Sequence, residues 1–148
     1  MTRHYFAYGS NMHPGQMKER CPSSKLLGKA LLEQHILRFN KKGMDQTAKA
    51  NIMTSAEANS QVWGVLYRLE DEDFRNLDGH EIGYDRQEIQ VLFEGNATSC
   101  LTYRAREDYL CTGIPPTEGY VKRILEAAKL HDFPENFFDF LRRAISSL

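Results

Sequence analysis

Near its N-terminus the chain reads Tyr-Phe-Ala-Tyr-Gly-Ser-Asn-Met, from Tyr5 to Met12. The first four residues are mostly aromatic, which is typical of a buried β-strand. Gly9-Ser10-Asn11 then favours a turn, because these residues tolerate unusual backbone angles. Successive N–H groups in a turn can hold an anion, and a glycine lets a ligand approach the backbone closely. Such residues also form ordinary surface turns, so this stretch predicts a strand and a turn and leaves ligand binding open.

The composition favours one soluble domain, which we expect to span residues 1–148 and to be cytoplasmic. Lys and Arg number 19 against 20 Asp and Glu. The formal net charge of −1 gives no general field that would attract nucleic acid or anionic lipid, so we expect neither as a partner. No run of about 18 apolar residues is present, as a membrane-spanning helix requires.

The cysteines and histidines do not indicate a metal site. Cys21, Cys100 and Cys111 are odd in number and far apart in sequence, a pattern that favours reduced, buried thiols over a disulfide framework or a zinc site. The histidines lack the His-x-x-x-His spacing of metal-binding helices. We therefore predict no metal centre.

Strand patterns dominate the first hundred residues. Leu26–Phe39 is ambiguous between helix and strand, and we favour a strand over Leu31–Phe39 because turn-forming residues follow it and no helix cap is evident. The clearest strand is Val62–Leu69, in which Gly64 marks a bulge or a close backbone approach. The remaining predicted strands are a short one within 43–60 and a hairpin formed by Tyr84–Phe93 and Thr98–Arg104.

Helical patterns are short at first and longer at the end. Pro14–Arg20 predicts a helix with Asn11 or His13 near its start, and Glu70–Leu77 predicts another that Asp78-Gly79 ends. Further helices are predicted to begin after an N-cap at Thr117 and at Pro134. Strands and helices do not alternate regularly, so we predict an α+β domain with a mixed curved sheet or small β-barrel and peripheral helices.

Glu81 is the carboxylate most suited to catalysis, since it lies between two glycines and beside apolar residues. Partial burial would raise its pKa toward the working pH, as a general base requires. A solvated loop glutamate is the alternative, and Asp78 and His80 fit the end of a helix equally well. Ser10 lacks the Gly-x-Ser-x-Gly context of a nucleophile. A turn rich in N–H groups and a carboxylate base together suit a reaction whose nucleophile belongs to the substrate.

Four segments resemble the γ-glutamylcyclotransferase-like superfamily. Phe6–Met12 resembles its signature turn, and Val62–Tyr67 its central strand. Leu77–Glu81 is similar to its catalytic-glutamate segment and Pro115–Tyr120 to the start of its late helix. The four segments occur in the family's order and cover nearly the whole chain.

The resemblance implies a mixed β-barrel, no cofactor, and a cavity in which the turn faces Glu81. It also implies release of 5-oxoproline from a small γ-glutamyl substrate, whose own α-amino group attacks its γ-carbonyl. Glu81 would then be the catalytic acid and base. The implied substrate-binding residues are Tyr8, Gly9, Ser10, Asn11, Met12, Tyr84 and Tyr120.

One feature departs from the superfamily pattern: Ile82 follows the glutamate where relatives often have glycine, and Gly83 comes next. The identity of the leaving group stays open, as does the choice between a monomer and a homodimer. A non-catalytic domain that binds a small molecule on the same fold is the alternative function.

Overall fold

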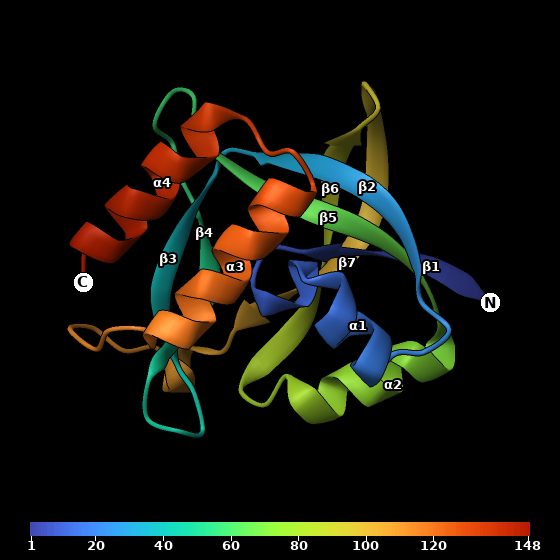
Figure 1. Ribbon diagram of the computed structural model, residues 1–148, viewed down its shortest axis with the longest axis horizontal. Coiled ribbons are helices and arrows are strands. Elements are labelled where there is room, and N and C mark those ends of the chain that lie inside the picture. The colour runs from blue at the N-terminus through green and yellow to red at the C-terminus, as the bar shows by residue number, and fades with distance from the viewer.

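The computed structural model describes residues 1–148 as a closed five-stranded β-barrel with four α-helices around it and a separate two-stranded hairpin (Figure 1). The barrel strands lie in the order β1 (Thr2–Ala7), β5 (Gln61–Glu70), β2 (Lys25–Glu33), β6 (Tyr84–Phe93) and β7 (Asn96–Ala105). Neighbours are antiparallel except β1 and β7, whose parallel pairing closes the barrel. The predicted α+β class and barrel are confirmed.

The remaining elements surround the barrel. The hairpin consists of β3 (His35–Lys42) and β4 (Ala48–Thr54), and α4 (Glu135–Ser146) packs on β3. The other helices are α1 (Pro14–Arg20), α2 (Asp71–His80) and α3 (Glu118–Leu130), with short 3₁₀ turns η1 (Ser10–Met12) and η2 (Glu107–Tyr109).

The single strand predicted over Leu31–Phe39 is wrong, because the segment contributes to two different sheets. Gln34 separates β2 from β3 and has a positive φ of 60°. Its N–H donates to Ser60 O at 2.9 Å, and its C=O accepts from Ser55 N–H at 2.8 Å. These bonds connect the end of β2, where the chain leaves the barrel, to the residues just before β5, where it returns. The apolar alternation within residues 31–39 contains no information about this long-range contact.

The other predicted strands and the late helices are confirmed. The β6–β7 hairpin turns through Glu94-Gly95, both of which have positive φ. Thr117 caps α3, since its Oγ1 accepts from Tyr120 N–H at 3.1 Å. Local turn and cap chemistry is therefore enough to place these elements.

The structure decides between two predicted starts for α1 and corrects the predicted end of α2. The N-cap of α1 is His13, whereas Asn11 lies in η1 and directs its side chain elsewhere. Helix α2 continues through Gly79 to His80, because a glycine in a helix costs only about 1 kcal/mol and does not by itself end it.

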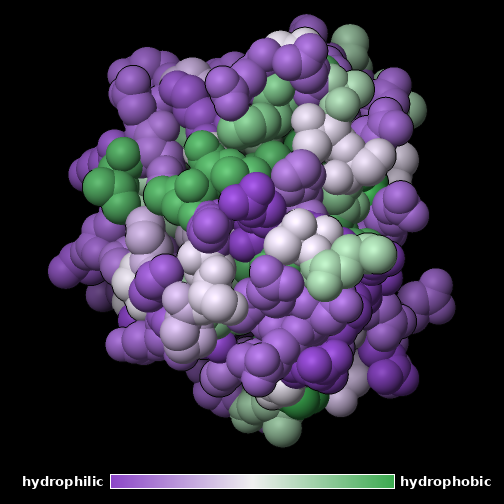
Figure 2. All heavy atoms as spheres, turned by 90° about the vertical axis from the view of Figure 1, so that its right-hand side faces the viewer, coloured by the Kyte–Doolittle hydropathy of each residue, from purple (hydrophilic) through white to green (hydrophobic).

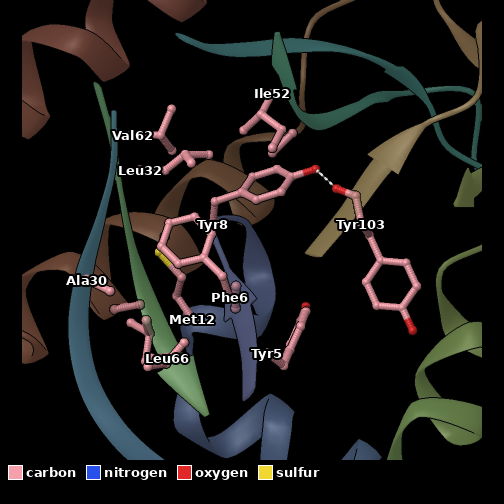
Figure 3. Packing of buried hydrophobic residues seen from close by; sticks show 14 of the residues in the cluster. Tyr5, Phe6, Tyr8, Met12, Ala30, Leu32, Ile52, Val62, Leu66 and Tyr103 are labelled. Atoms are coloured by element: carbon pink, nitrogen blue, oxygen red, sulfur yellow. Dashed lines mark hydrogen bonds between the residues drawn. The ribbon is translucent and has the colours of Figure 1, made fainter. Parts of the chain in front are cut away.

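The hydrophobic core takes buried residues from all five barrel strands. Phe6, Ala30 and Leu66 belong to it and lie with Met12 (Figure 3). Gly64 allows β1 and β5 to approach closely, because a Cβ there would lie 2.5 Å from Ala7 O. The prediction of a close backbone approach at this glycine is therefore the correct one of the two alternatives.

The cysteines are free thiols, with Cys21 and Cys100 buried and Cys111 half-buried. No helix has the length and apolar character needed to cross a membrane. The face on the right of Figure 1 is mainly hydrophilic, with hydrophobic atoms gathered over part of it (Figure 2).

Candidate active site

The turn after β1 is fixed from two sides. The Tyr67 hydroxyl, from β5, donates to Asn11 O at 2.8 Å. His131, just after α3, has its Nε2 3.0 Å from Met12 O. The aromatic strand and the polar turn of the N-terminal stretch are thus held against both the barrel and α3.

Glu81 follows α2 directly, and its N–H still donates to Leu77 O at 2.8 Å. The chain then turns at Gly83, whose φ is +87°, and a Cβ there would lie 2.5 Å from the Tyr109 ring. Relatives often have a glycine directly after the glutamate, and in this chain that glycine comes one position later, at Gly83. The intervening residue, Ile82, is 42% exposed. This one-residue change does not turn Glu81 away from the site.

Asn11 joins the turn to Glu81. Its Nδ2 donates to Glu81 Oε1 at 2.9 Å and to the Tyr5 hydroxyl at 3.0 Å. Its Oδ1 accepts from Gln16 Nε2 and from Arg20, each at 2.9 Å. Every hydrogen-bonding position of this amide is occupied, so it holds the carboxylate in a fixed orientation.

Burial dominates the electrostatics of Glu81. Its side chain is only 16% exposed, and burial raises its pKa above the ordinary value of 4.5. Arg20, 3.6 Å away, opposes this rise, followed by the hydrogen bond from Asn11 and the charge of Lys41. The carboxylate therefore has a higher proton affinity than a solvated glutamate, and the alternative of a solvated loop residue is wrong.

Glu81 and the turn line one cavity of about 360 Å³. It brings together seven of the eight residues predicted for the site: Tyr8, Gly9, Ser10, Asn11, Glu81, Tyr84 and Tyr120. A larger hollow of about 460 Å³ lies beside β3 and α4 and contains none of them.

Met12 is the exception, and its predicted binding role is not supported. Its side chain is fully buried in the core, and its N–H donates to Gly9 O at 3.1 Å (Figure 3). The 3₁₀ geometry of η1 thus uses the N–H that an anion would need. The N–H groups of Ser10 and Asn11 make no bond to a main-chain carbonyl.

The three predicted tyrosines differ in how their hydroxyls are used. Tyr8 donates to Tyr103 O at 2.5 Å (Figure 3), and Tyr84 donates to Ala50 O at 2.7 Å. Tyr120 instead accepts from Ala50 N–H at 3.0 Å, so its proton remains free for a ligand. Burial raises the pKa of all three, which keeps them neutral donors.

Sequence reasoning missed several residues of the cavity, notably Arg20 and Lys41. Lys41 continues the inward alternation of Leu37 and Phe39 along β3, which is a usable signal. We interpreted it instead as part of a turn. Arg20 gives no such signal, since a basic residue at a helix end is common.

Comparison with known proteins places this geometry in a family. Residues 5–122 match the family model "Gamma-glutamyl cyclotransferase, AIG2-like". The chain belongs to this family. Gamma-glutamylcyclotransferase of Homo sapiens is 31% identical over 146 residues, which cover 93% of this chain and 76% of the human protein. The Bos taurus protein of the same name is 31% identical over 138 residues, covering 88% of this chain and 72% of its own.

The fold agrees with solved structures of the same family. A structure described as "Gamma-glutamyl cyclotransferase" superimposes with a TM-score of 0.85 at 25% identity, covering 96% of this chain and 87% of that one. Membership of the γ-glutamyl cyclotransferase family confirms the resemblance seen in the sequence, and the barrel is the one that this family forms.

Proposed function

We propose that this protein is a γ-glutamyl cyclotransferase that converts a small γ-glutamyl compound into 5-oxoproline and a free amine or amino acid. The observation that carries the proposal is the buried carboxylate of Glu81, held by Asn11 at 2.9 Å and directed into the cavity beside the Gly9–Asn11 turn. Its raised pKa suits a group that must first accept a proton and then return it.

The reaction needs little beyond folding the substrate and moving protons. The substrate's α-amino nitrogen forms a bond to the γ-carbonyl carbon, and the bond from that carbon to the leaving nitrogen breaks. Effective molarities of well-oriented intramolecular attacks reach about 10⁵–10⁸ M. Glu81 first takes one proton from the substrate's ammonium group, which frees the amine lone pair that attacks. The attacking nitrogen loses a second proton once the new bond has formed. The leaving nitrogen gains one proton from Glu81 as its bond breaks and a second in water, where it becomes an ammonium.

The turn and Tyr120 supply the remaining groups. The N–H groups of Ser10 and Asn11 are not used by main-chain carbonyls, and that of Ser10 lies against the Tyr120 hydroxyl. Both can donate to the glutamyl carboxylate or to the oxyanion formed during attack. The free hydroxyl proton of Tyr120 is a third donor in the same cavity. The main-chain N–H groups and the Tyr120 hydroxyl are uncharged, so they add no positive charge to the cavity that contains Glu81.

A panel assay tests the proposal against a non-catalytic binding domain. The protein is incubated with γ-glutamyl amino acids and γ-glutamyl amines, and 5-oxoproline is quantified. We expect release from at least one class and none from the Glu81→Gln variant. Binding of panel members without any release would support the binding domain.

A further inference from the structure

Gln16 is a neutral residue of the cavity whose amide is fully hydrogen-bonded. It lies on α1 one turn before Arg20, and both side chains reach Asn11 from the same face of the helix. The Gln16 Nε2 donates to Ser10 Oγ at 2.7 Å and to Asn11 Oδ1 at 2.9 Å. Its Oε1 accepts from Arg123 Nη1, on α3, at 2.6 Å. Gln16 thus connects α3 to two residues of the turn that follows β1.

The two ends of this hydrogen-bond chain fix its direction. A guanidinium can only donate, so Arg123 requires the carbonyl oxygen of Gln16 and turns the amino group of Gln16 toward Asn11. An ionised carboxylate can only accept, so Glu81 requires the amino group of Asn11. The carbonyl oxygen of Asn11 then faces the amino group of Gln16. Both ends therefore favour the same orientation of the two amides.

The opposite orientation of the Asn11 amide is unfavourable on both sides. A rotation by 180° would bring Oδ1 to the position of Nδ2, 2.9 Å from Glu81 Oε1, where two acceptors repel one another. The same rotation would direct Nδ2 at the donors of Gln16 and Arg20. In the rotated state Glu81 would receive no hydrogen bond from Asn11, and the donors on the far side of the amide oppose that state.

Gln16 and Arg20 respond differently to the charge of Glu81. Arg20 lies 3.6 Å from the carboxylate and is attracted to it only while the carboxylate is ionised. Gln16 is neutral and makes no bond to Glu81, so its bond to Asn11 does not depend on that charge. A general acid and base is protonated and deprotonated in every cycle. Gln16 is therefore the donor that holds Asn11 in both states of the carboxyl group.

Gln16 also leaves one atom of Ser10 available. The serine hydroxyl accepts from Gln16 and donates to no group of the protein, so its proton is free for a ligand in the cavity. A hydroxyl that accepts a hydrogen bond becomes a stronger donor, because hydrogen bonds in a chain polarise one another. The same amide thus orients two neighbouring residues of the turn.

We propose that Gln16 is a positioning residue of the active site. Anchored by Arg123, it keeps the amino group of Asn11 on Glu81 and leaves the hydroxyl proton of Ser10 for the substrate. The consequence for turnover rests on the proposed cyclotransferase function, whereas the effect on the Glu81 carboxyl group does not.

A titration of Glu81 tests the role of Gln16 without any turnover. Protein labelled with ¹³C at the glutamate side-chain carboxyl is titrated by NMR, and the Glu81 signal is assigned by its absence from Glu81→Gln. Gln16→Met keeps the length of the side chain and removes its donors. The titration midpoint of Glu81 should then move upward by about 0.5–1 pH unit, the shift that corresponds to one hydrogen bond of ordinary strength.

The substitution leaves the charge around Glu81 unchanged. The charged and titratable groups that act on this carboxyl group all stay in place: Arg20 of α1, Lys41 of β3, and the tyrosines at positions 5, 8, 84, 103 and 120. An upward shift therefore reports the lost hydrogen bond. An unchanged or lowered midpoint in Gln16→Met would overturn the proposal.

Arg123→Met tests the anchor of Gln16 while α1 stays intact. It removes the donor that fixes the Gln16 carbonyl oxygen, so the midpoint should again move upward. Lys122→Met is the matched control, because it removes the same charge from the neighbouring exposed residue of α3, whose side chain makes no hydrogen bond or salt bridge. Equal shifts in these two variants would overturn the role of the anchor, since they would report the loss of charge alone.

An exchange of the two side chains tests the direction of the chain. Gln16→Arg combined with Arg123→Gln keeps the net charge of the cavity and the donors that face Asn11. Its midpoint should lie at or below that of wild type, because a cation then lies closer to Glu81. A midpoint as high as that of Gln16→Met would show that donors at this position do not hold Asn11.

Turnover separates the inference from the proposed function. On a panel substrate that wild type converts, Gln16→Met should lower kcat by about 3–10-fold and change KM less, since Asn11 no longer holds Glu81 in place. A shifted midpoint with unchanged kcat would overturn the catalytic part of the proposal. Absence of 5-oxoproline from wild type would refute the function, and the NMR titration would still decide whether Gln16 positions Asn11 on Glu81.

Discussion

The C-terminal end of α2 presents two carboxylates to two different regions of the molecule. Asp78 faces β6 and β7 at the surface, where its side chain is 47% exposed, whereas Glu81 faces the cavity and is 16% exposed. Arg86 donates to both oxygens of Asp78, at 2.9 and 2.6 Å, and the Tyr103 hydroxyl adds a bond of 2.6 Å. Glu81 receives one hydrogen bond, from Asn11.

This difference in donors gives opposite pKa shifts. Burial tends to raise the pKa of Asp78, but the bonds from Arg86 and Tyr103 outweigh it and the pKa is lowered. Burial prevails at Glu81, and its pKa is raised. An arginine lies near each carboxylate, so the presence of a cation does not decide the outcome; the number of direct donors and the degree of burial do.

Glu81→Gln is expected to have the largest effect on activity. The substitution keeps size and hydrogen bonding but removes the base, so kcat should fall by at least about 10²-fold. The raised pKa means that the folded state favours the neutral carboxyl group, and the stability linked to this group is lost as pH rises through the folded pKa. At neutral pH the variant should therefore unfold at the same temperature as wild type or higher.

Glu94→Gln is the control for that comparison, because Glu94 is exposed in the β6–β7 turn. Its activity and unfolding temperature should match wild type. Near-normal turnover by Glu81→Gln would show that Glu81 is not the catalytic base. A large loss of stability would contradict the conclusion that burial raises the pKa of this carboxylate.

Gly9→Val tests the cavity while leaving both carboxylates intact. A Cβ at Gly9 would lie 3.1 Å from the Tyr120 hydroxyl and 3.4 Å from Ala50 Cβ, so a branched side chain displaces the donors. We expect kcat/KM to fall about tenfold or more, mainly through KM, because misplacing substrate by about 1 Å has a large effect. Steady-state kinetics and the affinity for 5-oxoproline or glutamate measure this.

Gly79→Ala is the matched glycine control. A Cβ at Gly79 has nothing within 4 Å, and the residue lies inside α2 close to Glu81. The substitution should leave kcat/KM unchanged and stabilise the helix by up to about 1 kcal/mol. Equal losses in the two glycine variants would contradict a specific role for Gly9.

The pH profile gives a directional test of the difference between the two carboxylates. The value of kcat/KM should fall on the acid side with a midpoint above the ordinary glutamate value of 4.5, because Glu81 must be ionised to act as a base. Arg20→Gln should move this midpoint upward, since Arg20 lowers the pKa of Glu81. A midpoint that moves downward in Arg20→Gln would refute the assigned source of the acid limb.

Asp78→Asn should have the smallest effect and should act on stability alone. The lowered pKa means that the Asp78 charge contributes stability above its unfolded pKa, a contribution lost as pH falls through the folded pKa. We expect the free energy of unfolding at neutral pH to fall by about 1 kcal/mol or less, because the side chain is half exposed. Denaturant unfolding measures this free energy. A loss of turnover in Asp78→Asn as large as that in Glu81→Gln would show that the two carboxylates do not differ in function.

The sequence by itself determined those parts of the molecule that depend on neighbouring residues. The β6–β7 hairpin followed from alternation around Glu94-Gly95, and α3 from its Thr117 cap. The turn at Gly9–Asn11 and the candidate base at Glu81 were also identified, since their local composition matches a family pattern. In these cases the interactions that define the element lie within a few residues.

Only the tertiary structure decided how these parts meet. The bond from Asn11 to Glu81 joins residues 70 positions apart, and Gln34 divides one apolar run between two sheets through contacts with Ser55 and Ser60. The same holds for Lys41, whose burial in the cavity results from aromatic rings that β6 and η2 bring to it. A pattern along one segment indicates which face is buried, but not which distant groups lie against it. Those distant groups set the charge of the cavity and the pKa of Glu81.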